Sequence, residues 1–294
     1  MLKYKVGDSA GKNIRGAKVF PGGVILTTEY EKIIAGDINN LKFYDLHTHS
    51  RYSFDGDNPP AGEIDAMAEA AITAGLRGIA VTDHCDIDGV LDGYYPKYDK
   101  EEIRRDVLAA KEKYAGKLEI LYGIELGQPH AKPEEARRLL DECRFEYVLG
   151  SLHNLRGVPD FSFFHYGKME PEVIDHFMSR AVDELCEIAR FPGLTTMAHI
   201  TYPARYMRQD GVKYDFLKFE KKWRELFHIM IENGLNLEIN TSGLRKPNDG
   251  KTMPESDLIA LYKDQGGKRF VLGSDAHTSG DIGKGLAEGF EKIK

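Results

Sequence analysis

Histidines and carboxylates recur along this chain just after short apolar runs. Residues 43–46 lead into His47 and His49, residues 78–81 lead into His84, and residues 270–272 lead into Asp275. Short apolar runs between helical stretches are typical of buried parallel strands, and in strand–helix barrels the chemistry gathers where such strands end. We therefore expect six histidines and three carboxylates at one edge of one sheet: His47, His49, Asp55, His84, Glu125, His153, His199, Asp275 and His277.

So many imidazole and carboxylate groups share a small space only when cations hold them together. His47 and His49 are two positions apart on a predicted strand, so both side chains point to the same side of the pleat. Glu125 follows a strand end, where its two oxygens can bridge two cations. Asp55 lies in a loop rich in glycine and proline that can fold back over the site. The pattern therefore predicts a multinuclear metal site.

Helical patterns alternate with the predicted strands. Apolar residues at helical spacing, bounded by proline, aspartate or glycine, predict seven helices: residues 61–75, 101–115, one from Pro133, one from Pro171, one from Asp215 to Gly234, one from Pro254, and about 282–293. The strand at residues 235–239 has no candidate ligand. Strict alternation predicts a parallel α/β sheet with right-handed crossovers. Because the candidate ligands come from every part of the chain, we expect a closed or nearly closed barrel of seven units.

The first 40 residues stand outside this alternation, which begins at residue 41 and continues to residue 294. Within them, residues 24–28 and 32–34 favour strands and predict a small hairpin. We therefore expect two parts, a short N-terminal appendage at 1–40 and a barrel domain at 41–294.

The charge balance limits the partners. The formal net charge is −7, whereas duplex nucleic acid selects basic patches, so we expect no duplex-binding surface. The three cysteines form no CxxC pair and predict neither a disulfide framework nor a structural zinc site. The N-terminus lacks the apolar core of a signal peptide, and no apolar run reaches membrane-spanning length. We therefore expect a cytoplasmic enzyme.

Taken in order, the candidate ligands and their neighbours resemble the polymerase and histidinol phosphatase (PHP) family of metal-dependent phosphoesterases. The resemblance spans about residues 42–280 and rests on these pieces: His47-Thr48-His49, Asp55, Thr82-Asp83-His84, Gly123-Ile124-Glu125, Ser151-Leu152-His153, Ala198-His199 and Ser274-Asp275-Ala276-His277. The middle of the chain, from Gly150 through Phe163 to the helix before His199, looks most like the histidinol-phosphatase branch.

The resemblance implies a distorted seven-stranded (βα)7 barrel, similar to a TIM barrel, that holds three divalent metal ions. By this resemblance the first metal would be held by His47, His49, Glu125 and Asp275. Glu125 would bridge to a second metal, held also by His153 and His199. The third would be held by Asp55, His84 and His277. Imidazole and carboxylate ligands suit zinc, iron(II) or manganese.

The reaction that the resemblance implies is hydrolysis of a phosphomonoester. A water shared by the first two cations would lose a proton near neutral pH, because bound zinc lowers its pKa to about 7. The hydroxide would attack phosphorus in line while the cations neutralise the phosphate oxygens. Asp275 is the candidate to take the proton and pass it to the leaving group. Arg205 and Arg245, in loops at the expected active face, are candidates for binding the phosphate, because a guanidinium offers it paired hydrogen bonds.

The remaining polar residues are expected to have structural roles. Asp83 and Asp86 flank His84 and are expected to support ligands or form turns. We expect no metal role for His130, His165, His176 and His228, with the alternative for His165 that its aromatic loop covers the active face. The aromatic helix around Trp223 is expected to be core packing.

Three functions fit the pattern. The leading one is a small-molecule phosphatase, with L-histidinol phosphate as the first substrate to test. The second is a nucleotide phosphatase or single-strand exonuclease, which needs a basic, aromatic-lined groove. The third is a non-catalytic protein whose metals serve stability or docking. The chain departs from the histidinol-phosphatase branch after His199, where Ile200 stands in place of a frequent Pro-Asp pair. This departure bears on the substrate more than on the reaction.

Overall fold

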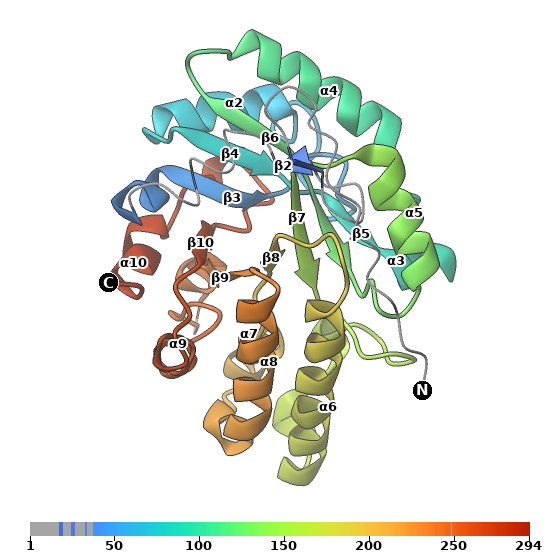
Figure 1. Ribbon diagram of the computed structural model, residues 1–294, viewed down its shortest axis with the longest axis vertical. Coiled ribbons are helices and arrows are strands. Elements are labelled where there is room, and N and C mark those ends of the chain that lie inside the picture. The colour runs from blue at the N-terminus through green and yellow to red at the C-terminus, as the bar shows by residue number, and fades with distance from the viewer. Residues whose placement is uncertain (1–17, 20–24, 27–32, 34–37, 248) are drawn as a thin grey trace.

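The strands of the main sheet follow one another around it in chain order (Figure 1). The computed structural model describes residues 18–19, 25–26, 33, 38–247 and 249–294. Within them, neighbouring strands pair in parallel in the order β3 (Tyr44–Thr48), β4 (Gly78–Val81), β6 (Glu119–Gly127), β7 (Tyr147–Ser151), β8 (Thr196–Met197), β9 (Asn236–Asn240) and β10 (Phe270–Gly273). The prediction of a seven-stranded parallel α/β fold is confirmed.

The first and last strands of this sheet meet at their C-terminal ends. The backbone N–H of His49 donates to the carbonyl of Ala276, and the N–H of Asp275 donates to the carbonyl of His47, both at 2.8 Å. Thr48 and Ala276 form an isolated parallel bridge. The barrel is therefore nearly closed, and the closing contacts fall beside four of the predicted ligands, from opposite ends of the chain.

The second strand is interrupted between β4 and a short following segment that contains His84 and Asp86. β4 pairs with residues 119–122 of β6, and the short β5 (His84–Asp86) pairs with residues 125–127 of the same strand. Thr82 and Asp83 lie between the two segments and are fully buried. Because side chains alternate along a strand, His84 and Asp86 share one side of β5 while Cys85 lies on the other.

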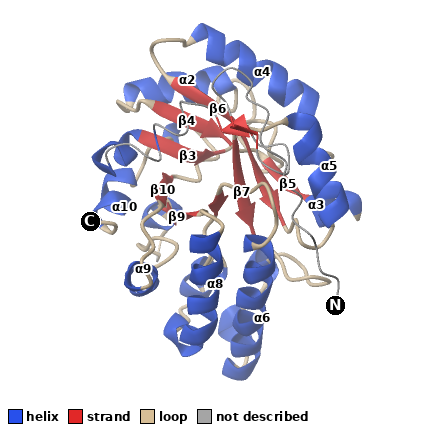
Figure 2. Cartoon of the chain, viewed as in Figure 1, coloured by secondary structure: helices blue, strands red, loops and turns tan. Residues whose placement is uncertain are grey.

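Helices cover the outer face of the sheet, as Figure 2 shows. All seven predicted helices are present: α2 (Ile64–Thr73), α4 (Lys100–Lys113), α5 (Pro133–Cys143), α6 (Pro171–Ala189), α8 (Glu220–Glu232), α9 (Ser256–Asp264) and α10 (Leu286–Glu291). The helix predicted from Asp215 begins as a 3-10 turn, because the Asp215 carboxylate accepts from the N–H of Leu217 at 3.0 Å. Trp223 of α8 is fully buried, as expected for core packing.

The structure also has short helices that the sequence patterns did not predict. Two are α-helices, α3 (Ile87–Leu91) and α7 (Pro203–Gln209), and each follows a strand end that holds predicted ligands. The others are the 3-10 helices η1 (Ile38–Phe43), η2 (Phe161–Phe163), η3 (Tyr166–Lys168), η5 (Ser242–Arg245) and η6 (Ser279–Asp281), whereas η4 (Phe216–Phe219) is the 3-10 turn that opens the helix predicted from Asp215. At five to seven residues, α3 and α7 are too short to produce a helical apolar period.

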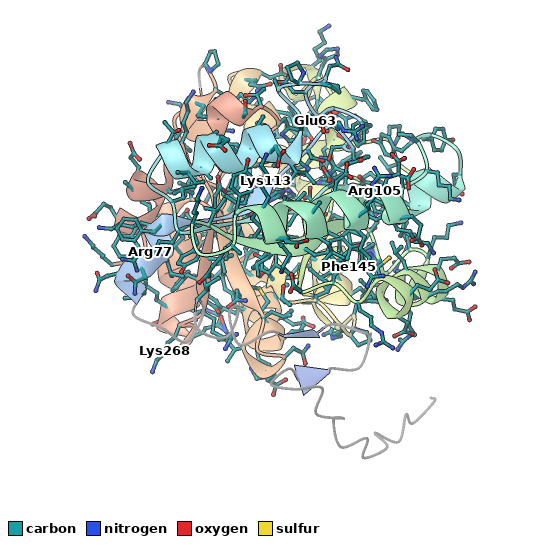
Figure 3. The ribbon with its side chains drawn as sticks, turned by 90° about the horizontal axis from the view of Figure 1, so that it is seen from above. Glu63, Arg77, Arg105, Lys113, Phe145 and Lys268 are labelled. Carbon is teal, nitrogen blue, oxygen red and sulfur yellow. The ribbon has the colours of Figure 1, made fainter. Side chains whose placement is uncertain are left out.

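The helices separate a charged outer surface from the apolar residues that face the sheet. In Figure 3, Arg105 and Lys113 lie on the outer side of α4, and both side chains are more than half exposed. On the inner side of the same helix, Ile103 and Val107 are buried. Phe145, just before β7, is fully buried. No helix in the described part of the chain is long and apolar enough to cross a membrane.

A two-stranded antiparallel pair lies in the N-terminal segment. β2 (Ile25–Leu26) falls within the predicted strand at 24–28, but its partner is β1 (Lys18–Val19). The predicted partner at 32–34 falls outside the described residues except for Ile33, which is helical and buried. The predicted pairing of 24–28 with 32–34 therefore lies largely outside the described residues, within which Ile25–Leu26 pairs with Lys18–Val19. The boundary between an appendage at 1–40 and the barrel stays a prediction.

Candidate metal centre

A fully buried carboxylate, Glu125 at the end of β6, lies at the centre of the predicted site. Its Oε1 lies 2.7 Å from Nε2 of His199 and 3.1 Å from Nε2 of His153. Its Oε2 lies within reach of three more imidazole nitrogens, at 2.8 Å from His84 Nδ1, 3.2 Å from His47 Nε2 and 3.5 Å from His49 Nε2. The two oxygens thus face different groups of histidines, which is the arrangement that a bridging carboxylate needs.

Asp275 completes the group around His47 and His49. Its Oδ1 lies 3.4 Å from His49 Nε2 and 3.8 Å from His47 Nε2. Asp275 has a backbone φ of 54°. A residue other than glycine that adopts the left-handed region is strained, and such strain persists where the surrounding structure enforces it, often at functional sites. The closing contact between β10 and β3 holds Asp275 in this position.

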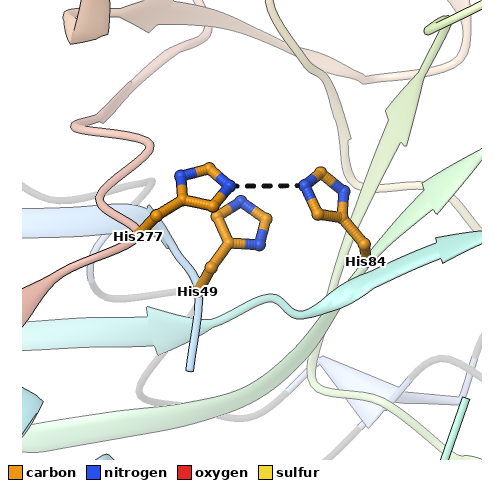
Figure 4. Close-up of side chains that lie close together, drawn as sticks. All are labelled: His49, His84 and His277. Atoms are coloured by element: carbon orange, nitrogen blue, oxygen red, sulfur yellow. Dashed lines mark hydrogen bonds between the residues drawn. The ribbon is translucent and has the colours of Figure 1, made fainter. Parts of the chain in front are cut away.

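A third group lies toward the surface. Figure 4 shows His49, His84 and His277 side by side, with His277 Nε2 and His84 Nε2 3.5 Å apart. Asp55, whose side chain is 43% exposed, lies 3.1 Å from His277 Nε2 and 3.6 Å from His84 Nε2. The loop that contains Asp55 therefore folds back over the site, as predicted. All nine predicted ligands come together here.

Several buried atoms of this cluster lie close together without forming hydrogen bonds. Among the described residues, no hydrogen-bond partner is found for His47 Nε2, His49 Nε2, His84 Nδ1 and Glu125 Oε2. Buried polar atoms without partners are costly, so their convergence calls for another species that satisfies their lone pairs. Four sets of three groups place their ligand atoms within 4.8 Å of one another: His49, His84, His277; His47, Glu125, His199; His47, His49, Asp275; and His84, Glu125, His153. Nitrogen and oxygen donors in such sets fit divalent transition metals.

The charges of the cluster also favour cations. Burial alone would raise the pKa of Glu125, but His47, His84 and His153 hold it well below its ordinary value. Burial likewise opposes ionisation of Asp275, yet His47, His49 and Arg205 hold its pKa well below the ordinary range. Both carboxylates are therefore ionised at neutral pH, and a divalent cation can replace the protons that the imidazoles hold.

Three buried groups contact Nδ1 of a predicted histidine ligand, the ring nitrogen that faces away from the centre. Nδ1 of His153 lies 2.7 Å from Asp86 Oδ1, and Nδ1 of His49 lies 3.0 Å from the hydroxyl of Ser53, which donates to Asp83 at 3.0 Å. Both contacts leave Nε2 of the histidine facing the centre. Such partners fix the tautomer and ring orientation of a metal-binding histidine. Asp83 and Asp86 thus lie where supporting groups were expected.

The third supporting group, Glu238 of β9, was missed by the sequence analysis. Its Oε1 lies 2.6 Å from Nδ1 of His47, and its Oε2 accepts from the N–H of His199 at 2.7 Å. The strand had been given no functional residue because its end lacks a histidine or carboxylate. A signal was present: Asn236, Glu238 and Asn240 alternate with apolar residues, and all three are fully buried. Alternating polar residues in a buried strand face a polar barrel interior.

The two predicted phosphate-binding arginines differ in their contacts. Arg205 donates from Nη2 to Asp275 Oδ2 at 2.9 Å and to the hydroxyl of Ser242, while its buried Nε has no partner among the described residues. Arg245 donates to the carbonyls of Ser274 and Asp275 and lies near Asp281. Arg205 therefore reaches the cluster itself, whereas the contacts of Arg245 support the backbone of the Asp275 loop.

The four histidines assigned no metal role lie apart from these groups. His130 contacts Glu184 at 3.0 Å, and His228 on α8 contacts Glu232. His165 and His176 are exposed. None of them belongs to a candidate metal-binding group among the described residues.

Comparisons with known proteins agree with this arrangement. The family model named PHP domain matches residues 45–242. A histidinol-phosphatase from Lactococcus lactis is 26% identical over 246 residues, covering 81% of this chain and 86% of that protein. A protein of Thermotoga maritima named "Probable histidinol-phosphatase" is 28% identical over 252 residues, covering 85% of this chain and 91% of that protein.

A solved structure shows the same fold. The crystal structure of histidinol phosphate phosphatase from Lactococcus lactis, complexed with zinc, L-histidinol and phosphate, superposes with a TM-score of 0.71. Its sequence is 22% identical, and the match covers 85% of this chain and 92% of that one.

Proposed function

Since this chain belongs to the PHP domain family, we propose that it is a metal-dependent phosphomonoester hydrolase that acts on L-histidinol phosphate or a close analogue. The observation that carries the proposal is the convergence of the nine predicted ligands, Glu125 among them, with buried ligand atoms for which no hydrogen-bond partner is found among the described residues. The relatives named histidinol-phosphatase support the substrate class. The proposal also places the enzyme in the cytoplasm and predicts a small phosphorylated substrate.

We propose that three divalent cations, of zinc, manganese or iron(II), occupy the centre. The zinc bound by the Lactococcus lactis protein supports zinc for this chain. The first ion would be held by His47, His49, Glu125 and Asp275, the second by Glu125, His153 and His199, and the third by Asp55, His84 and His277. When bound, such ions supply an activated water and neutralise charge on phosphate oxygens.

The protein side chains would place the phosphate and move the proton. Arg205 holds the Asp275 carboxylate through Nη2, and its buried Nε has no partner among the described residues, so this guanidinium can also donate to a phosphate oxygen. Asp275 would accept a proton from the attacking water and return it to the leaving alkoxide. Tyr202 packs its ring against His153 and His199, at 5.0 and 5.1 Å between ring centroids, and limits access of bulk water on that side.

The test is phosphate release from a panel of substrates. Protein loaded separately with zinc, manganese or iron(II) is assayed with L-histidinol phosphate, simple phosphomonoesters, nucleotides and short single-stranded DNA. We expect preference for L-histidinol phosphate, loss of activity on chelation, and loss in a His153→Ala variant. His176→Ala, which removes an exposed histidine from α6, serves as the matched control and should retain activity.

Other outcomes would revise the proposal in definite ways. Preference for nucleotides or DNA would keep the metal chemistry and replace the substrate. No release from any substrate by the metal-loaded protein would favour a non-catalytic role for the metals. Near-full activity of an Asp275→Asn variant that still binds metals would remove Asp275 as the proton carrier.

A further inference from the structure

Asp55 is the most exposed of the nine predicted ligands, and its position depends on the loop that contains it. This loop, residues 51–62, returns to its starting point, because the N–H of Arg51 donates to the carbonyl of Gly62 at 2.7 Å. A compact surface loop whose ends adjoin is an Ω-loop, a form that is frequent at functional sites. What holds the ends of the loop therefore bears on where Asp55 lies.

The loop is packed closely against itself and against the metal centre. A Cβ at Gly56 would lie 2.0 Å from the carbonyl oxygen of Ser50, and a Cβ at Gly62 would lie 1.9 Å from that of Asp57. The N–H of Asp57 in turn donates to the carbonyl of His277 at 3.0 Å. Since the backbone leaves no space between these segments, a shift at the ends of the loop displaces its middle as well.

Four side chains hold the ends of the loop to the helices. Nε of Arg51 donates to Oε2 of Glu63, the residue before α2, at 3.0 Å. Nη2 of Arg51 donates to the Tyr52 hydroxyl at 2.6 Å and to Oδ2 of Asp106 on α4 at 3.3 Å. The Tyr52 hydroxyl donates to the same oxygen of Asp106 at 2.6 Å, and the guanidinium of Arg51 lies 4.2 Å from the centroid of the Tyr52 ring.

Asp106 is the fixed point of this network. Its Oδ2 accepts both hydrogen bonds from the loop, while its Oδ1 accepts from Nε of Arg105 at 2.8 Å. The side chain is only 25% exposed, so these charged contacts are less screened than those of a fully exposed pair. Its helix is anchored by the buried Ile103 and Val107. The loop is thus tied to an element that packs on the sheet.

We infer that Asp106 is a positioning residue for Asp55. It contacts neither the substrate nor a metal, and acts through Tyr52 and Arg51, which place the loop so that the Asp55 carboxylate reaches the outer group of histidines. Loss of Asp106 should weaken the ion that Asp55 binds and leave the ions bound by Glu125 in place. The inference rests on the proposed function, because it concerns the third of the proposed cations.

The test measures zinc binding rather than turnover. Competition with a zinc chelator gives the number of bound ions and the affinity of the weakest one. We expect Asp106→Ala to weaken one ion about tenfold, the lower end of the range for a group that supports a metal ligand, and to retain the others. Tyr52→Phe should weaken the same ion by a smaller factor, because Arg51 still contacts Asp106 in that variant.

Lys113→Ala is the matched control. It breaks an ion pair of 2.7 Å between the same helix and Asp65 of α2 without contacting the loop, and should bind zinc as the wild type does. A double-mutant cycle shows whether the effect of Asp106 passes through Asp55. Asp55→Ala should lose the weakened ion, and the addition of Asp106→Ala should then change zinc binding no further.

Several results would overturn the inference. They are zinc binding by Asp106→Ala equal to that of the wild type, an equal loss in Lys113→Ala, retention of every ion by Asp55→Ala, and an equal effect of Asp106→Ala with and without Asp55. If zinc binding depends on Asp106 through Asp55 but no phosphomonoester is hydrolysed, the proposed function fails while the inference stands. If L-histidinol phosphate is hydrolysed but Asp106→Ala binds zinc normally, the inference fails while the proposed function stands.

Discussion

Glu238 joins His47 to His199 from behind the metal centre, with one carboxylate oxygen for each. Oε1 faces Nδ1 of His47 at 2.6 Å, and Oε2 accepts from the backbone N–H of His199 at 2.7 Å. His47 lies on β3, which closes against β10, and His199 follows β8, which pairs with β9. A single buried group therefore sets the ring orientation of one predicted ligand and the backbone position of another.

Glu238→Gln should weaken metal binding. An amide offers only one acceptor oxygen and turns an N–H group toward one of the two donors, so one contact is lost. Loss of such a supporting partner lowers metal affinity by roughly 10–100-fold. Competition with a zinc chelator measures the effect, and Glu232→Gln on the exposed part of α8 is the control. Equal zinc affinity in the two variants would show that Glu238 does not orient the ligands.

Gly273→Ala should disturb the same contact without removing any polar group. A Cβ at this position would collide with Oε1 of Glu238 and lie 2.5 Å from Cβ of His47. We expect a loss of zinc affinity similar to that of Glu238→Gln, since both changes displace His47. Gly280→Ala is the control, because its Cβ would meet only Thr278 Oγ1, at 3.7 Å. Unchanged zinc affinity in Gly273→Ala, measured by the same competition, would contradict the prediction.

Asp45→Ala should loosen the closure of the barrel. The buried Asp45 carboxylate accepts three hydrogen bonds: from the N–H of Ser274 at 2.8 Å, from the Ser274 hydroxyl at 2.5 Å and from the N–H of Gly283 at 2.7 Å. Leaving buried donors without an acceptor costs about 1–3 kcal/mol each, so we expect a loss of roughly 3 kcal/mol in the free energy of unfolding. Urea denaturation measures it.

Asp99→Ala provides the comparison for Asp45→Ala. Asp99 caps α4 at an exposed position, and loss of such a cap costs about 1 kcal/mol. A smaller loss of unfolding free energy in Asp45→Ala than in Asp99→Ala would show that the hydrogen bonds of Asp45 do not hold the barrel closed.

Glu184→Gln should change how stability depends on pH. Burial opposes ionisation of Glu184, but hydrogen bonds from His130 and from the N–H of Arg156 lower its pKa from the ordinary 4.5. Because the folded pKa lies below the unfolded one, the ionised carboxylate stabilises the protein above about pH 4.5, and this is lost as pH falls through the folded pKa. The Tm difference between wild type and variant should therefore shrink as the pH falls from about 6 to 3.

Glu172→Gln, on the exposed first turn of the same helix, controls for the change of charge. A Tm difference between wild type and Glu184→Gln that stays constant across this pH range would show that ionisation of Glu184 does not contribute.

The strands and the convergence of the nine predicted ligands could be predicted from the sequence. Each of these side chains follows a short apolar run or lies in the loop after one. Chain order alone then places them at one edge of a parallel sheet. Asp55 is the instructive case: aspartate before glycine is a common turn former, yet the loop brings it to 3.1 Å from His277. Its position depends on the backbone contact of Asp57 with His277, which joins distant segments and leaves no local signal.

What could not be predicted depends on contacts across the barrel. Glu238 acts on His47, 191 positions away, and sequence spacing contains no information about that pairing. The different contacts of Arg205 and Arg245 likewise arise from where α7 and η5 lie, and α7 was too short to predict. The pairing of β1 with β2 was not predicted, because short strand-like runs do not fix which neighbour a strand pairs with.

The closure between β3 and β10 has a consequence for the order of events during synthesis. His47 and His49 leave the ribosome long before Asp275 and His277, yet all four contribute to one cluster that forms only when the last strand docks against the first. A nascent chain that ends before Asp275 therefore holds only part of the donor set.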